Sequence, residues 1–346
     1  MDVSPASEAQ WAGEAQWAGD AQCATEAQSA SASSARRDGR RLLQLALATA
    51  WLLDGVLQLQ PGFFTTSFGA RTITGAAAGN PWAVSRPIVL SGQFIGDHAI
   101  VSNTVFAVTQ ILLGLGIAWR PALRWALAAS IPWSLGVWWI GEGLGGALSG
   151  GATVLAGGPG AVFVYAVLAV VLWPADRAGT APAFVAARAV GLKTARAVWC
   201  TFWGALTLSS LLGANRSAQG IHDLVSGMEP GEPGWLAALD RDVAALVSQR
   251  GLALSLALAV LLALVALGVY LPLPASRLAV ALAVVIAVVS WVVTQDFGTL
   301  LAGGATDPNS GPLLVLLALA YWRRGPVPPG RPRLARAPGI AVEAGG

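Results

Sequence analysis

A few acidic and amide side chains interrupt an otherwise apolar chain, and these are the residues that could do chemistry. Asp54 is the clearest case, because it falls about two-thirds of the way along a long apolar stretch, and Gln58 follows one helical turn later. A carboxyl group in such a stretch is costly to bury, and it therefore indicates either a function or a buried pairing. Asp54 could transfer a proton, bind a ligand, or pair with Arg71, Arg86 or His98. The sequence leaves these possibilities open.

A second group of candidates lies where the next apolar stretch begins. Asp97 and His98 stand just before it, and Asn103 and Gln110 follow, seven residues apart on one helical face. Such side chains can contribute to a ligand site, or they can join neighbouring helices by hydrogen bonds. Both interpretations apply here.

Two glycine-rich, weakly apolar segments, 141–159 and 294–312, each lead into a short apolar stretch. Matching interruptions in two parts of a membrane protein often line a binding site. The structural alternative is that small residues merely let helices approach closely. Residues 141–146 also match a dinucleotide-binding string, but no strand precedes them, so the context that this motif requires is missing.

The two glycine-rich segments differ in their acidic residues. Glu142 aligns with Gln295, whereas Asp296 and Asp307 align with glycine and valine of the first segment. Any function of these acidic residues would therefore be divided unequally between the two segments. This predicts one asymmetric site rather than two equal ones. Asp307 also opens an Asp-Pro-Asn-Ser-Gly sequence that favours a turn, because Asp and Asn can bond their own backbone. We favour the turn over direct ligand binding and keep Asp307 as a candidate.

His98 and His222 are the only histidines in the chain. With nearby carboxyl groups they could bind a metal ion or hold a haem from opposite faces. A pH-sensitive surface role, or no role, is the commoner situation, so no metal site is expected.

Four tryptophans gather toward the expected outer ends of two apolar stretches, namely Trp133, Trp138, Trp139 and Trp291. Anchoring at the membrane interface explains them better than a cation-binding cage does.

The elements that must position these residues are helices in lipid. Of the 346 residues, 55% are hydrophobic and only 11% are charged, against roughly a quarter charged in soluble domains. The net charge of +3 is not gathered on one soluble surface, so the expected partner is the lipid bilayer and not nucleic acid. Several apolar stretches approach the roughly 20 residues that cross the hydrocarbon core, which predicts an all-α integral membrane protein. Eight transmembrane helices are expected near 42–60, 99–119, 122–141, 158–174, 197–213, 251–271, 276–294 and 311–323.

A further helix is expected to lie on the outer membrane surface over 235–249. Leu236, Leu239, Val243 and Leu246 repeat at helical spacing there, with Asp240 on the other face. Its counterpart earlier in the chain begins at Trp82.

An internal repeat sets the expected architecture. Residues 121–162 recur at 274–315 without a gap, at an offset of 153, and the pairs Trp138/Trp291 and Gly145/Gly298 keep this register. An even number of helices in each copy gives both copies the same orientation. The sequence predicts two parallel four-helix repeats, 41–174 and 197–324, joined by a cytoplasmic linker over 175–196.

The basic residues orient this arrangement. In it, sixteen of the 21 lysines and arginines face the cytoplasm, as the positive-inside rule expects. The five that face outward are Arg71, Arg86, Arg216, Arg241 and Arg250. Both termini are therefore predicted to be cytoplasmic, with disordered tails over 1–40 and 325–346 and a location in the plasma membrane.

The unit that starts at Arg41-Leu-Leu-Gln and passes Trp51-Leu-Leu-Asp-Gly-Val-Leu-Gln58 resembles the DoxX-like membrane families. The resemblance covers 41–174 and, more faintly, 197–323, where the Asp-Gly pair is missing. Residues 139–143 and 306–312 also look like segments of actinobacterial multi-pass membrane proteins. These resemblances imply a bacterial membrane protein and, by analogy only, a quinone-linked redox accessory role.

Three functions remain open at this point. The first is binding or transport of a small ligand from the outer side, among Asp54, Asp97, His98, Glu142, Gln295 and Asp296. The second is a quinone-linked redox subunit, and the third is a scaffold for a membrane or extracytoplasmic protein partner. We favour the first, because buried carboxyl groups need a reason, and the sequence does not decide whether the protein is an enzyme.

Overall fold

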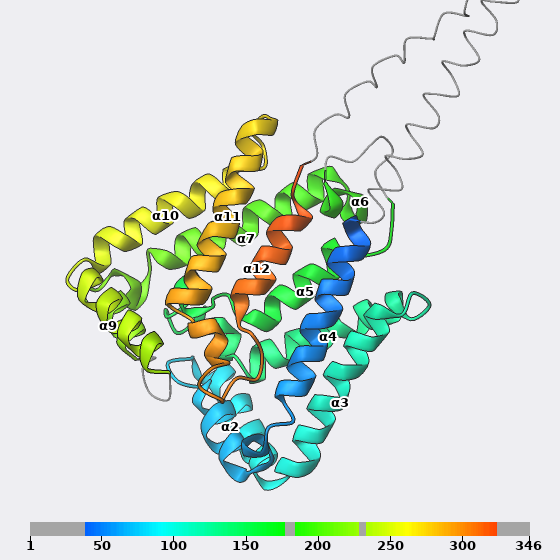
Figure 1. Ribbon diagram of the computed structural model, residues 1–346. Helices are drawn as coiled ribbons and strands as arrows, with labels where there is room; N and C mark the ends of the chain where they lie inside the picture. Colours follow the sequence, from blue (N-terminus) through cyan, green and yellow to red (C-terminus); the bar gives the residue numbers. More distant parts are fainter. Residues whose placement is uncertain (1–38, 177–183, 228–232, 324–346) are drawn as a thin grey trace, which may run out of the picture. The chain divides into compact units, whose positions relative to one another are not determined.

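The computed structural model describes residues 39–176, 184–227 and 233–323, and every regular element within these ranges is helical (Figure 1). All eight expected helices are present as elements, with ends that differ by a few residues. They are the first helix (39–57), α3 (Ala99–Ala118), α4 (Leu123–Ile140), α5 (Ala161–Val171), α7 (Leu192–Ser210), α10 (Gly251–Gly268), α11 (Leu273–Val293) and α12 (Ser310–Ala320). Of the expected tails, only residues 39 and 40 are described, and they are already helical.

Three helices, α3, α10 and α11, are long and apolar enough to cross a membrane. Their surfaces expose many large apolar side chains, among them Ile100, Val108, Leu112, Val260, Leu264 and Val285. A surface of this kind suits lipid rather than water.

The two short helices α5 and α12 each contain 11 residues. At 1.5 Å per residue such a helix is about 16 Å long, roughly half the hydrocarbon thickness. Each ends three residues before the expected end, and α5 also begins three residues later than expected.

Elements in the two halves of the chain coincide at the offset of 153 residues. The first helix over 39–57 corresponds to α7 over 192–210, and the short turn η3 (Gly143–Gly146) corresponds to η6 (Asp296–Thr299). Both turns break the preceding helix in the same way, through four consecutive residues with positive φ. These are Gly143–Gly146 in η3 and Asp296–Thr299 in η6.

The described part of the expected linker over 175–196 contains helical structure. It includes α6 (Val185–Val190), whose Ala186 and Ala187 are fully buried, and α7 begins there at Leu192. The sequence did not reveal this because α6 is only six residues long. Small residues nevertheless let α6 pack against α5 and α7.

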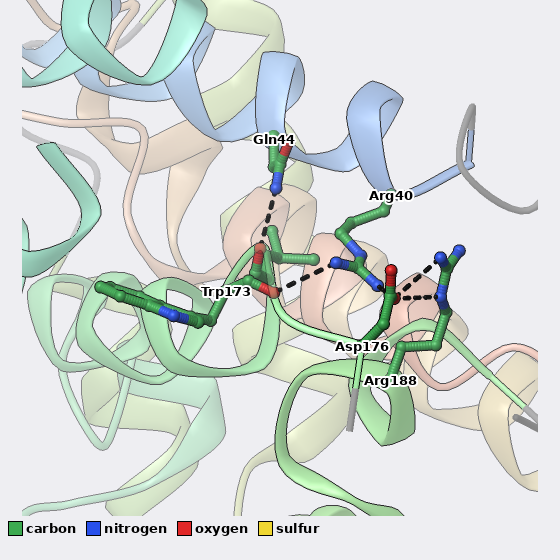
Figure 2. Close-up of polar contacts among 6 residues, drawn as sticks. Arg40, Gln44, Trp173, Asp176 and Arg188 are labelled. Carbon is green, nitrogen blue, oxygen red and sulfur yellow. Dashed lines mark hydrogen bonds and ion pairs between the residues drawn. The ribbon is translucent and has the colours of Figure 1, made fainter. Parts of the chain in front are cut away.

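An ionic cluster ties this region to the first helix (Figure 2). Arg40 and Arg188 both donate to the same carboxyl oxygen of Asp176, and Gln44 donates to the carbonyl oxygen of Leu172 at 2.9 Å. Leu172 follows the last residue of α5, where carbonyl groups lack helical partners. The cluster therefore closes the end of α5.

Other arginines close helix ends in a similar way. Arg41 donates to the carbonyl oxygens of Ile117 and Ala118 at the end of α3. Arg323 donates to the carbonyl oxygen of Leu271, just beyond α10, at 2.9 Å. A positive side chain is favourable at the C-terminal end of a helix dipole.

The expected surface helix exists as α9 (Gly234–Val247), but its buried face differs from the expectation. Leu236, Asp240 and Ala244 are buried, whereas Leu246 is 64% exposed. The helix turns this face inward because it packs against α8 (Gly220–Ser226). The expected counterpart also exists as α2, which spans Trp82–Asp97 and begins at the tryptophan that the sequence indicated.

Candidate functional site

A cavity of about 320 Å³ lies within the first half of the chain. Its walls are contributed by the first helix, α2, α3, α4 and the segments around residues 72, 142 and 307. The apolar part of the lining includes Trp51, Phe68, Ile95, Phe106, Trp133 and Val162. The polar part is Asp54, Gln58, Thr72, Gln110, Glu142, Thr306 and Asp307, without lysine, arginine or histidine. This composition is typical of a small-molecule site, which is mainly apolar with a few convergent polar groups.

Asp54 is only 2% exposed and faces the cavity from the first helix. Its Oδ1 atom and the hydroxyl of the nearby Tyr165 are both buried without a hydrogen-bond partner within the described chain. The Tyr165 ring stacks on Trp51 at a centroid separation of 4.1 Å, which holds the phenol beside the acid. A carboxyl oxygen without a partner in an apolar wall is a group available to a ligand.

The pairing partners expected for Asp54 lie elsewhere. Arg71, Arg86 and His98 are exposed, and Arg86 instead stands over the ring of Trp82 at 5.4 Å. The ion pairs between described residues do not include Asp54. Of the roles that the sequence left open for Asp54, the described residues show no ion pair, and proton transfer and ligand binding stay open.

Gln58 and Asn103 bond to each other and join the first helix to α3. Gln58 donates from Nε2 to Asn103 Oδ1 at 2.6 Å, and Asn103 donates from Nδ2 to the carbonyl oxygen of Gln58 at 2.7 Å. Both residues are buried. Asn103 thus supports the cavity wall, whereas Gln58 lines the cavity directly.

Glu142 stands two residues beyond the end of α4 and meets the start of α5. Its Oε1 atom accepts a hydrogen bond from the backbone N–H of Val162 at 3.1 Å, while Oε2 is buried without a partner in the described chain. Gly160 leaves the space that this carboxyl group occupies, because a Cβ atom at Gly160 would overlap Oε2. Burial raises the pKa of Glu142 to about 8, and the nearby charge of Asp307 adds to this effect.

Asp307 forms the expected turn and also lines the cavity. Its Oδ1 accepts from the backbone N–H of Asn309 at 2.7 Å, and its Oδ2 accepts from the hydroxyl of Thr306 at 3.0 Å. The turn prediction is therefore confirmed. Asp307 interacts electrostatically with both Asp54 and Glu142, so the turn brings a second-half acid to a first-half cavity.

A second cavity of about 330 Å³ adjoins the first and is lined mainly by the glycine-rich loop 145–160. Glu142 and Asp307 line both cavities. These two carboxyl groups therefore stand at the boundary between an apolar chamber and a more polar one.

The remaining candidate residues are not brought to this site. Asp97 and His98 are exposed, and the His98 ring stacks on Phe94. Gln295 is buried among backbone groups: it donates to the carbonyl oxygen of Val154 at 2.9 Å and accepts from the N–H of Gly311. Asp296 is also buried but is not part of the cavity lining.

Two further residues of the site, Trp51 and Trp133, had only weak signals in the sequence. Trp51 stands one helical turn before Asp54 and shares its face. Trp133 lines the cavity and was interpreted as an interfacial anchor, since sequence alone does not show which way a helix turns. Trp138 and Trp291 instead donate to the carbonyl oxygens of Pro159 and Pro308 at 2.6 and 2.7 Å.

Within the described residues, no three His, Cys, Asp or Glu side chains are arranged to hold a metal ion. His222 bonds to the neighbouring Asp223 at 3.0 Å and lies outside the cavity lining.

Comparison with protein-family models, with curated proteins and with solved structures finds no match to this chain. The site geometry therefore carries the functional argument.

Proposed function

We propose that this chain is a multi-pass plasma-membrane protein that binds or transports a small ligand in the cavity between Asp54, Glu142 and Asp307. The observation that carries the proposal is the pairing of an apolar chamber with carboxyl oxygens that lack partners in the described chain. Buried polar groups are normally satisfied, and exceptions need an explanation. A bound ligand supplies one.

The proposed architecture is an eight-span bundle of two parallel four-helix repeats, with both termini in the cytoplasm. The coincidence of helix bounds at the 153-residue offset supports the repeat. The arginines that close the ends of α3, α5 and α10 support the orientation, since basic residues accumulate on the cytoplasmic side. In this orientation the loop cavity beside Glu142 opens toward the outer side, which gives the ligand a route of access.

Filling the cavity tests the ligand site directly. Gly136 lines it, and a Cβ atom at Gly136 would meet nothing within 4 Å, so Gly136→Leu adds bulk without a clash at Cβ. Gly204 in α7 has equally open surroundings but is not part of the cavity lining, which makes Gly204→Leu the matched control. Three aromatic probes of similar size and a short-chain quinone are then titrated against full-length protein in mild detergent, with the thermal shift as the readout.

At least one probe is expected to stabilise the wild type and the Gly204→Leu variant but not the Gly136→Leu variant. If no probe binds the wild type, or if the two variants respond equally, the cavity is not the ligand site. Mass spectrometry of small molecules that co-purify with each protein gives a second readout. A native ligand should be depleted only in the Gly136→Leu variant.

A quinone is the second candidate ligand, in line with the DoxX-like resemblance. Trp51 and Trp133 line the cavity, and their indole N–H groups have no acceptor within the described chain. These indole N–H groups can donate hydrogen bonds to the carbonyl oxygens of a quinone. Binding of the quinone in preference to all other probes would favour this candidate.

The orientation has its own test by cysteine labelling in cells. Asp97 and Arg120 are both exposed and are expected on opposite sides of the membrane. In a background without Cys23 and Cys200, an impermeant thiol reagent should label Asp97→Cys and spare Arg120→Cys. The reverse pattern would invert the proposed topology.

A further inference from the structure

We infer that the ligand of this cavity is a small organic cation, an ammonium group carried on a compact aromatic or aliphatic body. The inference rests on the proposed function, because it names the chemical class that the proposed site would take. It follows from three features of the lining: its charge, its unused acceptors and its aromatic walls.

The charge of the lining is one-sided. Asp54, Glu142 and Asp307 interact electrostatically with one another, and no basic residue is among the described residues that line the cavity. Like charges that share a poorly solvated site disfavour one another's ionisation. A cation relieves this repulsion, whereas an anion would add to it.

The unused acceptors suit an ammonium group. Asp54 Oδ1, Glu142 Oε2 and Gln110 Oε1 are buried without hydrogen-bond partners in the described chain, and all three residues line the cavity. An ammonium group carries up to three N–H donors and no acceptor. Its hydrogen bonds to carboxylates are among the stronger ones in proteins.

The aromatic walls suit the rest of such a ligand. Trp51, Phe68, Phe106 and Trp133 contribute rings to the lining. Aromatic faces attract cations and pack against apolar bodies. Hard metal ions take six or more oxygen ligands, and transition metals favour tight groups of His, Cys and acidic side chains. The described residues form no group of three such side chains that could hold a metal ion. An organic cation fits this lining better than a metal ion.

The test compares three probes that share a phenyl ring and differ mainly in charge. They are 2-phenylethylamine, 2-phenylethanol and 3-phenylpropionate, titrated by isothermal calorimetry into the full chain in mild detergent at pH 8.5. The proteins are the wild type, Glu142→Gln, Asp54→Asn and the control Asp97→Asn, which neutralises an exposed acid outside the lining. Two cavity variants are used because either one alone could fail to fold.

The amine is expected to bind the wild type and Asp97→Asn with equal affinity. Glu142→Gln and Asp54→Asn should each weaken it by about tenfold or more, as expected for the loss of one charge-assisted hydrogen bond. The affinity of the alcohol should remain within about threefold of its wild-type value, and the propionate should not bind.

The outcomes separate this inference from the proposed function. If the alcohol or the propionate binds as tightly as the amine and Gly136→Leu blocks it, the cavity is a ligand site and the cation inference is wrong. The inference also fails if the amine does not bind, or if both charge-neutralising variants bind it like the wild type. Amine binding that survives Gly136→Leu places the amine outside the cavity and overturns both proposals.

Discussion

Glu142 and Gln295 stand 153 residues apart, and each accepts a hydrogen bond from the backbone N–H of the second residue of a short helix. Glu142 Oε1 accepts from the backbone N–H of Val162 at 3.1 Å, at the start of α5. Gln295 Oε1 accepts from the N–H of Gly311 at 3.3 Å, at the start of α12. Each side chain thus satisfies a free N–H in the first turn of a short helix.

The two residues differ in what their remaining atom does. Gln295 donates from Nε2 to the carbonyl oxygen of Val154 at 2.9 Å and is fully buried. Glu142 turns its second oxygen toward the cavity without a partner in the described chain. In the second half the side chain that accepts this hydrogen bond has a structural role. In the first half the accepting side chain also presents a carboxyl group to the cavity.

The first prediction exchanges these two residues. Glu142→Gln retains an acceptor for the Val162 N–H, so its melting temperature should be at least that of the wild type at pH 8. Gln295→Glu removes the donor to Val154 and buries a second acid, which should cost about 1 to 3 kcal/mol of folding free energy. Thermal unfolding of both variants in the same detergent measures the difference. Equal losses in the two variants would contradict the distinction between a structural and a ligand-binding role.

The second prediction concerns pH. Burial, aided by the charge of Asp307, raises the pKa of Glu142 from its ordinary value of 4.5 to about 8. Between these values the folded protein holds a proton that the unfolded chain has released, so this group favours folding most below pH 4.5. Its contribution is lost as the pH rises through about 8. The groups that face Glu142 are Asp307, Asp54 and the Tyr165 hydroxyl.

The melting temperature of the wild type should therefore decline between pH 5 and pH 8.5. Glu142→Gln should show a shallower decline, while Asp97→Asn should follow the wild type. Parallel curves for all three proteins would show that Glu142 does not hold the proton.

The third prediction uses two glycines with similar backbone angles. Gly160 (φ 109°, ψ 134°) precedes α5, and Gly191 (φ 85°, ψ 157°) precedes α7. Alanine should strain the backbone comparably at both positions, by about 1 to 3 kcal/mol. Only Gly160→Ala also places a Cβ atom against Glu142 and Trp138, since the surroundings of Gly191 are open.

Gly160→Ala should therefore destabilise the fold more than Gly191→Ala and should also weaken ligand binding. Thermal shift for stability and calorimetry with 2-phenylethylamine for binding check the two parts. If both variants lose stability equally and bind equally well, Gly160 does not make room for the acid.

Much of the helical framework was predictable, because helix length and apolar content are local properties. All eight expected helices exist, and the helix that begins at Trp82 was located from its equivalence to Trp235. The break after α4 was also visible, since glycine accumulates where the chain takes positive φ, as at Gly145.

The grouping of the site was only partly predictable. Asp54, Gln58, Glu142 and Asp307 were candidates and do line one cavity. They could not be separated from Asp97 and His98 by sequence alone, because the exposure of these residues depends on how α2 and α3 pack. Trp133 was expected to anchor the membrane interface, and the structure shows that it also lines the cavity. Its residue type suits an interface and a cavity wall equally, and only tertiary packing distinguishes the two.

The last prediction concerns the ionic cluster at the end of α5 that is shown in Figure 2. Burial alone would raise the pKa of Asp176, but hydrogen bonds and charges from Arg40 and Arg188 outweigh it and hold this pKa below its ordinary value. Asp176 therefore contributes stability at neutral pH that is lost as the pH falls through the lowered pKa, below about 4. Asp176→Ala leaves Arg40, whose side chain is only 9% exposed, without a counter-charge. Because Asp176 is itself 64% exposed and solvent screens its charge, we expect a loss of about 1 kcal/mol at pH 7.

The control is Asp223→Ala, because Asp223 is 71% exposed and bonds only to the adjacent His222 among the contacts of the described chain. The loss of folding free energy in Asp223→Ala should stay below about 0.5 kcal/mol. Urea or thermal unfolding at pH 7 and at pH 3.5 should show the Asp176→Ala deficit shrinking at the lower pH, where the wild-type carboxyl begins to protonate. A deficit that is constant with pH would mean that Asp176 acts through packing rather than through its charge.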